Sequence, residues 1–205
     1  MPRWIRPPLL LALALLAAPS AASAATTILC LGDSLTEGYG VDPAQAWPAR
    51  LEERLRSLGH RDLRVVNAGI SGATSASAVS RLRWQLRARP DVLILALGGN
   101  DGLRGLDLDQ TRRNLGEAIA LAKQSGLRVL LAGMKIPPNY GPDYTRKFER
   151  LFPEIAEREG VALIPFLLEG VAAVPRLNLP DGIHPNAEGY ERVTETVLER
   201  LLPLL

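Results

Sequence analysis

The apolar run at residues 92–97 constrains the fold of this chain more than any other stretch. Its sequence, Val-Leu-Ile-Leu-Ala-Leu, contains no polar side chain. A strand with one solvated face alternates apolar and polar residues, whereas a parallel strand covered by helices on both faces is apolar throughout. The run therefore predicts the central strand of a parallel sheet, and Gly98 and Gly99 predict a loop at its C-terminal end.

Four further apolar runs alternate with longer segments of helical periodicity. We expect strands at residues 27–31, 63–67, 92–97, 128–132 and 161–164. The intervening segments repeat apolar residues every three or four positions, as Trp47, Leu51 and Leu55 do, and this spacing is typical of amphipathic helices. The alternation predicts one α/β domain in which a five-stranded parallel sheet lies between two layers of helices.

The N-terminal segment has the features of a secretory signal peptide. Two arginines precede an apolar run at residues 9–18, and the small residues at 22–24 offer a cleavage site. The apolar run is too short to span a membrane, and no cysteine follows it closely enough for a lipid anchor. We therefore expect removal of residues 1–24, which leaves a domain of residues 25–205 in the periplasm or outside the cell.

Net charge and cysteine content limit the partners of the domain. The whole chain has 24 basic and 22 acidic residues, a formal net charge of +2. Loss of Arg3 and Arg6 with the signal peptide leaves 22 of each, a net charge of 0, so charge gives no reason to expect a nucleic-acid partner. Cys30 is the single cysteine, which excludes an intramolecular disulfide, and its leucine neighbours predict buried packing.

Polar or glycine-rich stretches follow four of the five expected strands. The C-terminal ends of parallel strands lie at one edge of a sheet, where open α/β sheets bind their ligands. We therefore expect the side chains of these stretches to meet at that edge. They are Gly32-Asp33-Ser34, the loop containing Gly72, Asn100, and Asp181 with His184.

Ser34 and His184 are the residue types of a nucleophile and its general base. A serine hydroxyl needs a base within hydrogen-bond distance, and the chain has only two histidines. His60 lies in a polar turn and is expected to face solvent. His184 instead follows Asp181 by three residues, with Gly182 between them to permit a tight turn. Asp181 can then orient the imidazole and stabilise its protonated form.

Three groups are candidates for an oxyanion hole. The backbone N–H groups of Ser34 and Gly72 are two of them, since Gly72 has no side chain to block its N–H. The side-chain amide of Asn100 is the third, and such donors stabilise the charge that develops during attack on an acyl carbonyl. Asp33 is expected to accept hydrogen bonds that structure its loop rather than to act as a catalytic acid.

These stretches resemble the four sequence blocks of the GDSL, or SGNH, hydrolase family. The resemblance rests on Gly32-Asp33-Ser34-Leu35, the Gly72 loop, Gly98-Gly99-Asn100-Asp101 and Asp181-x-x-His184-Pro185. It covers nearly the whole chain after the signal peptide. Residues 46–48, 102–105 and 138–141 are also similar to a bacterial periplasmic branch of the family, described as thioesterases, lysophospholipases and arylesterases.

The resemblance implies a flavodoxin-like α/β/α sandwich with sheet order 2-1-3-4-5. It implies Ser34 as nucleophile, Asp181 and His184 as the other members of a triad, and Ser34, Gly72 and Asn100 in the oxyanion hole. It also implies a small acyl ester or thioester substrate, no metal or organic cofactor, and an acyl pocket formed by residues 134–140. We expect a monomer without a stable membrane anchor. The residues expected to contact the substrate are Asp33, Ile136, Pro137, Tyr140 and Ile183.

Other functions fit the sequence less well. The nucleophile elbow of α/β-hydrolases, Gly-x-Ser-x-Gly, is absent. Ser71 comes nearest to it, but Ala73 stands where the motif needs its last glycine. A metal-dependent phosphoesterase would need more histidine ligands. A carbohydrate O-deacetylase could use the same triad. A flavodoxin-like phosphate- or nucleotide-binding module could use the Gly72 loop, but it would leave Asp181 and His184 without a role.

The loop after the fifth strand leaves one question open. Its apolar side chains could accept an acyl chain or could pack against the rest of the domain, and the sequence does not distinguish these. They are Val171, Val174, Leu177 and Leu179.

Overall fold

The computed structural model describes Met1 and residues 26–205. Apart from Met1, the expected signal peptide lies outside the described residues. Within the described part of the chain, no helix is both long enough and apolar enough to cross a membrane.

Five parallel strands form one sheet of order β2-β1-β3-β4-β5, which confirms the expected topology. The strands are β1 (Thr26–Gly32), β2 (Leu63–Gly69), β3 (Val92–Ala96), β4 (Arg128–Ala132) and β5 (Ala162–Ile164). The strand expected to be central is central. Ile94 of β3 is paired with Cys30 of β1 and with Leu130 of β4.

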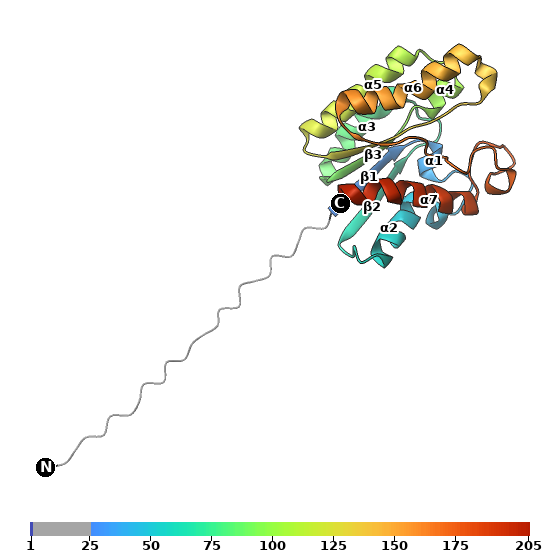
Figure 1. The fold of residues 1–205 in the computed structure, drawn as a ribbon. Coiled ribbons are helices and arrows are strands. Elements are labelled where there is room, and N and C mark those ends of the chain that lie inside the picture. Colours follow the sequence, from blue (N-terminus) through green and yellow to red (C-terminus); the bar gives the residue numbers. More distant parts are fainter. Residues whose placement is uncertain (2–25) are drawn as a thin grey trace.

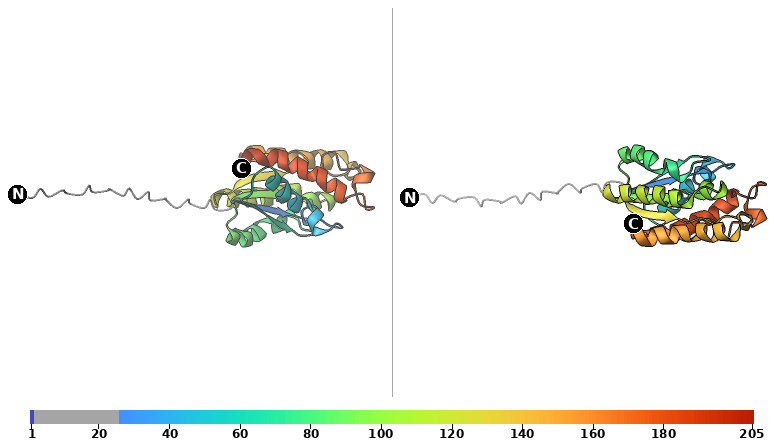
Figure 2. Two further views of the ribbon diagram at one scale, coloured as in Figure 1. Left: turned by 90° about the horizontal axis from the view of Figure 1, so that it is seen from below. Right: turned by 90° about the horizontal axis from the view of Figure 1, so that it is seen from above.

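Helices cover both faces of the sheet. They are α1 (Ser34–Glu37), α2 (Trp47–Ser57), α3 (Ala78–Gln85), α4 (Gly99–Leu103), α5 (Leu108–Gln124), α6 (Pro142–Glu159) and α7 (Ala187–Leu201). Helices α3, α5 and α6 lie on one face, and α2 packs against α7 on the other (Figure 1). Figure 2 shows the α2 and α7 layer from below and the α3, α5 and α6 layer from above. The architecture is the expected three-layer α/β/α sandwich.

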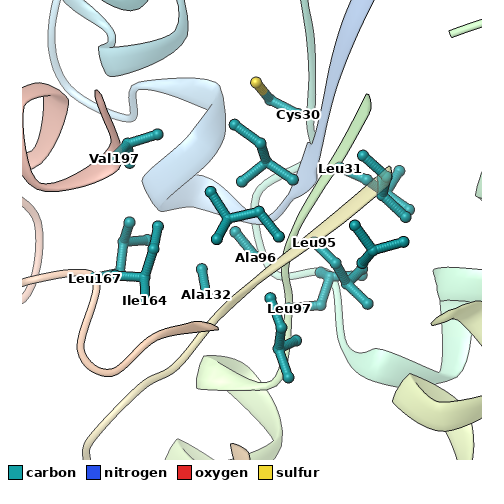
Figure 3. Close-up of a cluster of buried hydrophobic side chains, with 14 of the residues drawn as sticks. Cys30, Leu31, Leu95, Ala96, Leu97, Ala132, Ile164, Leu167 and Val197 are labelled. Atoms are coloured by element: carbon teal, nitrogen blue, oxygen red, sulfur yellow. The ribbon is translucent and has the colours of Figure 1, made fainter. Parts of the chain in front are cut away.

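The core is built around the central strands. Leu93, Ile94 and Leu95 of β3 are each 0% exposed. Figure 3 shows part of this core, with Leu31, Leu95 and Leu97 on one side of the strands and Val197 of α7 on the other. Complete burial of a leucine or isoleucine contributes about 1.5–3 kcal/mol, so this core holds the C-terminal ends of the strands firmly. Cys30 is also fully buried, as expected, and burial raises the pKa of its thiol.

Gly32 and Asp33 present Ser34 at the C-terminal edge of the sheet. A Cβ atom on Gly32 would lie 1.9 Å from Oγ1 of Thr36, so only glycine lets α1 begin this close to the end of β1. The Asp33 side chain caps the helix, with Oδ1 accepting a hydrogen bond of 3.0 Å from the N–H of Leu35. Ser34 therefore occupies the first position of α1, where its own N–H has no partner within the helix.

Candidate active site

Ser34 and His184 lie within hydrogen-bond distance although they are 150 positions apart in the sequence. Oγ of Ser34 is 2.9 Å from Nε2 of His184. Ser34 comes from the start of α1 and His184 from the loop between β5 and α7. The strand order brings both to the same sheet edge. This is the geometry in which an imidazole can take the proton of a serine hydroxyl.

Asp181 contacts the other side of the imidazole. Its Oδ2 is 2.8 Å from Nδ1 of His184, and its Oδ1 accepts hydrogen bonds from the backbone N–H groups of Ile183 and His184 at 2.9 and 3.0 Å. These bonds, the one from the His184 backbone first, lower the pKa of Asp181 to about 2. Asp181 is thus a carboxylate at neutral pH. The turn is possible because Gly182 adopts φ +71°.

Tyr39 packs against the imidazole and was not predicted from the sequence. The ring centroids of Tyr39 and His184 are 4.5 Å apart, with an interplanar angle of 40°. Tyr39 follows Gly38 at the end of α1, and nothing in the spacing of residues there distinguishes it from an ordinary surface tyrosine. Its position limits the directions in which the His184 ring can move.

Two backbone N–H groups are free to bind an oxyanion. Among the hydrogen bonds of residues 26–205, neither the N–H of Ser34 nor that of Gly72 has an acceptor. Both residues line the same cavity. Gly72 adopts φ +75°, a conformation that favours glycine. The two groups can therefore serve as donors to a tetrahedral intermediate.

Asn100 lies beside these donors, but its amide already has acceptors. Nδ2 of Asn100 donates to the carbonyl oxygen of Ala73 at 3.1 Å and to Oδ2 of Asp33 at 3.3 Å. Asn100 lines the cavity. It can act as the third oxyanion donor only by exchanging the longer bond, to Asp33, for a bond to the substrate oxygen.

Asp33, the residue directly before Ser34, is buried. It is 4% exposed, and burial raises the pKa of its carboxyl to about 6. Its contacts with the Leu35 N–H and with Asn100 connect the β1 loop to the β3 loop. These contacts fit the expected loop-structuring role. Asp33 also lines the cavity, where a contact with the substrate was expected.

The loop that carries Gly72 is held on several sides. Oε2 of Glu37 accepts from the N–H and from the hydroxyl of Ser71. The guanidinium of Arg104 donates to the Gly72 carbonyl at 3.0 Å. Buried Asp101 accepts from the N–H and the hydroxyl of Ser75 at 2.9 and 2.5 Å. These contacts fix the direction of the Gly72 N–H before any substrate binds.

A cavity of about 580 Å³ opens beside Ser34 and His184. Of the residues expected to contact the substrate, Asp33, Ile136, Pro137 and Ile183 line it. Tyr140 does not, because its hydroxyl instead donates to the Leu103 carbonyl at 2.7 Å. Apolar lining residues that the sequence did not single out are Leu35, Leu103, Phe166, Leu168, Ala172 and Ala173. A second hollow has a larger volume, about 720 Å³, and lies beside α7 among charged side chains. Neither Ser34, Asp181 nor His184 lines it.

The question about the loop after β5 is answered in favour of packing. Val171 and Leu177 are 0% and 2% exposed, and Val174 packs against the core. Leu179 contacts the backbone at Gly40. None of these four residues lines the cavity, whereas their neighbours Ala172 and Ala173 do.

The second histidine lies away from the site. His60 is exposed in the turn before β2, as expected. Among residues 26–205, no three or more side chains of histidine, cysteine, aspartate or glutamate gather as they would around a metal ion. The donor set needed for a metal-dependent phosphoesterase is thus not found in the described part of the chain.

Known proteins of similar sequence and fold identify the family. Residues 30–192 match the GDSL-like Lipase/Acylhydrolase family. Esterase TesA of Pseudomonas aeruginosa is 45% identical over 184 residues, which cover 89% of this chain and 91% of that protein. The Escherichia coli protein named thioesterase 1/protease 1/lysophospholipase L1 is 38% identical over 185 residues, covering 90% and 87%. A crystal structure of TesA has a TM-score of 0.85 at 44% identity, covering 88% of this chain and 100% of that one. The chain belongs to the GDSL-like lipase/acylhydrolase family.

Proposed function

We propose that this protein hydrolyses carboxylic esters and thioesters through an acyl-enzyme on Ser34. The observation that carries the proposal is the continuous chain of contacts from Ser34 Oγ to His184 Nε2 at 2.9 Å and from His184 Nδ1 to Asp181 Oδ2 at 2.8 Å. The names of the relatives, an esterase and a thioesterase/lysophospholipase, support the same reaction class.

The first half of the reaction forms the acyl-enzyme. Ser34 Oγ attacks the acyl carbonyl while His184 Nε2 takes its proton. Ionised Asp181 holds Nδ1–H of the imidazole and stabilises the positive charge on the ring. The carbonyl oxygen becomes negative and accepts from the N–H groups of Ser34 and Gly72, with Asn100 as the third donor. Collapse of the intermediate expels the alcohol or thiol, which receives the proton from His184.

The second half releases the acid. Water enters where the alcohol or thiol left, and His184 takes a proton from it as the water attacks the acyl carbon. The same two backbone donors stabilise the second tetrahedral intermediate. Its collapse breaks the bond to Ser34 Oγ, which recovers its proton from His184. The carboxylic acid leaves, and the enzyme returns to its starting state.

The cavity beside the triad fits the acyl part of the substrate. Its volume of about 580 Å³ is within the range of small-molecule sites, about 300–1,000 Å³. Ile136, Phe166 and Leu168 give its wall an apolar character. An acyl chain gains free energy from such a wall. The acetyl group of a carbohydrate O-acetyl ester would cover little of this wall, so the wall favours esters of longer acyl chains.

A substrate panel with a nucleophile variant tests the proposal. Purified protein is assayed on p-nitrophenyl esters, acyl-CoAs and lysophospholipids of increasing chain length, before and after a serine-directed fluorophosphonate. Ser34→Ala should lower kcat by about 10³-fold or more and abolish labelling. Ser57→Ala, which changes an exposed serine of α2, is the matched control. Retention of ester hydrolysis by Ser34→Ala would overturn the mechanism.

A further inference from the structure

Trp84, the second-last residue of α3, has an exposed side chain. Its side chain is 64% exposed, although tryptophan is usually well covered in folded proteins. Leu82, two positions earlier and so about 200° around the helix, is 0% exposed and packs into the core. The helix is thus anchored by the face that carries Leu82, and Trp84 points away from the molecule.

Arginines surround this tryptophan. Residues 78–90 contain Arg81, Arg83, Arg87 and Arg89 and no acidic residue. The last three are exposed, and no ion pair of the described residues includes any of them. The guanidinium carbon of Arg87 lies 4.1 Å above the Trp84 ring. The net charge of 0 expected for residues 25–205 is therefore unevenly distributed, with a local excess of positive charge on α3 and the residues directly after it.

A hollow with mainly apolar walls lies beside Trp84. It has a volume of about 480 Å³, and Ile70 and Trp84 lie on its walls. Ile70 is 54% exposed and directly precedes Ser71, which lines the catalytic cavity. Tyr39 and Ile183, on the rim of that cavity, are 51% and 48% exposed. Exposed apolar side chains thus lie both beside α3 and at the entrance to the active site.

We propose that this surface, which we call the Trp84 surface (Ile70, Arg83, Trp84, Arg87 and Arg89), binds anionic phospholipid bilayers. Indole rings favour the boundary between lipid headgroups and acyl chains. Guanidinium groups bind phosphate with two parallel hydrogen bonds. An acidic polymer would use the arginines but would leave Trp84 and Ile70 exposed to water, so the lipid surface accounts for more of the patch.

The proposal does not depend on the proposed reaction. Binding can be measured with Ser34→Ala, which carries every residue of the Trp84 surface but lacks the nucleophile. A bilayer-bound enzyme would have the entrance to its cavity close to lipid acyl esters. The failure of lipid binding and the failure of ester hydrolysis are therefore separate results.

Co-sedimentation with vesicles provides the test. Ser34→Ala protein is mixed with vesicles of phosphatidylcholine alone or with an equal amount of phosphatidylglycerol, at low and high NaCl. We expect binding to the anionic vesicles, weakened by salt. Replacing Arg83, Arg87 and Arg89 by glutamine should weaken it about fivefold for each arginine. The matched control replaces three exposed basic residues of α6, Arg146, Lys147 and Arg150, by glutamine.

Tryptophan fluorescence gives a second, site-specific readout. The emission lost when Trp84 is replaced by phenylalanine reports the exposed Trp84 ring. Trp47 is 0% exposed, and its emission, like any contribution from residues 1–25, is common to the proteins with and without Trp84→Phe. We expect this emission to shift to shorter wavelength on anionic vesicles. If the two triple variants weakened binding to anionic vesicles equally, the proposal would be overturned. Binding without a Trp84 shift, or a preference for heparin over vesicles, would also overturn it.

Discussion

The carboxylate of Glu37 accepts hydrogen bonds from both the backbone N–H and the hydroxyl of Ser71, the first at 2.7 Å. Glu37 is the last residue of α1, the helix that begins with Ser34. Ser71 directly precedes Gly72, the second backbone donor of the proposed oxyanion hole. One side chain thus connects the helix of the nucleophile to the loop that completes the hole.

Removing this connection should reduce catalysis more than substrate binding. Glu37→Ala removes one of the contacts that hold the Gly72 donor in place, so we expect kcat to fall about 5- to 10-fold, with KM nearly unchanged. Glu37→Gln keeps an acceptor without the charge and should give an intermediate value. Steady-state kinetics on one p-nitrophenyl ester measures both constants. Glu53→Ala, an exposed glutamate of α2, is the control. A rise in KM alone would show that Glu37 does not act through the oxyanion hole.

Asp101 should contribute to the stability of the fold. It is 2% exposed and accepts from Ser75 and, at 3.1 Å, from the hydroxyl of Thr111. Asp101→Ala leaves these buried donors unpaired, which we expect to lower the free energy of unfolding by about 3 kcal/mol. Urea unfolding measures this loss, and Asp109→Ala, an exposed aspartate of α5, is the control. Unchanged stability would mean that water replaces the carboxylate.

The sheet could be predicted because largely apolar strands alternate along the chain with amphipathic helices. β3 and β5 are each one residue shorter than the expected 92–97 and 161–164. Other strands extend beyond the expected ends where pairing continues through glycine. β2 was expected to end at residue 67, but its pairing with β1 continues to the Gly32 and Gly69 pair. Composition does not mark such a residue as part of a strand, because glycine is equally typical of the turn that follows.

The polar part of the site could be predicted, but the cavity wall could not. Ser34 follows the end of β1, and Asp181 and His184 lie together in the loop after β5. Both segments begin at the C-terminal edge of the sheet, so the topology favours their meeting. Ala172 and Ala173 line the cavity while Val171 is in the core. An irregular loop has no period that relates position to direction, so the sequence could not decide which of its apolar side chains line the cavity and which pack in the core. Tyr140, which was expected to contact the substrate, does not line the cavity.

Asp33 should make stability depend on pH in the direction opposite to most carboxylates. Its pKa is raised from 3.8 to about 6 by burial, so between these values the folded protein holds a proton that the unfolded chain has lost. Its contribution to stability is therefore fully present below pH 3.8 and is lost as pH rises through about 6. Asp33→Asn cannot titrate and lacks this dependence.

The difference in unfolding free energy between Asp33→Asn and the parent isolates this effect. Between about pH 4 and pH 7, we expect the free energy of unfolding of Asp33→Asn to rise relative to that of the parent by up to about 3 kcal/mol. Any constant cost of placing an amide beside Asn100 cancels from this shift. Chemical unfolding at several pH values measures it, with Asp62→Asn as an exposed control. A difference that stays flat would show that Asp33 is ionised in the folded protein throughout this range.

The size of the cavity should set the acyl chain length that the enzyme accepts. Ala172 lines the cavity, so the larger side chain of Ala172→Phe should fill part of the space for the distal end of the chain. Short esters need little of this space and should keep their kcat/KM. Each methylene excluded costs about 1–3 kcal/mol, so the ratio of kcat/KM for p-nitrophenyl decanoate over butyrate should fall at least about 10-fold. Ala44→Phe, which enlarges an exposed alanine away from the cavity, should leave the ratio unchanged. An equal loss on both esters would indicate that Ala172→Phe disturbs the triad, and an unchanged ratio would mean that the acyl chain does not reach this wall.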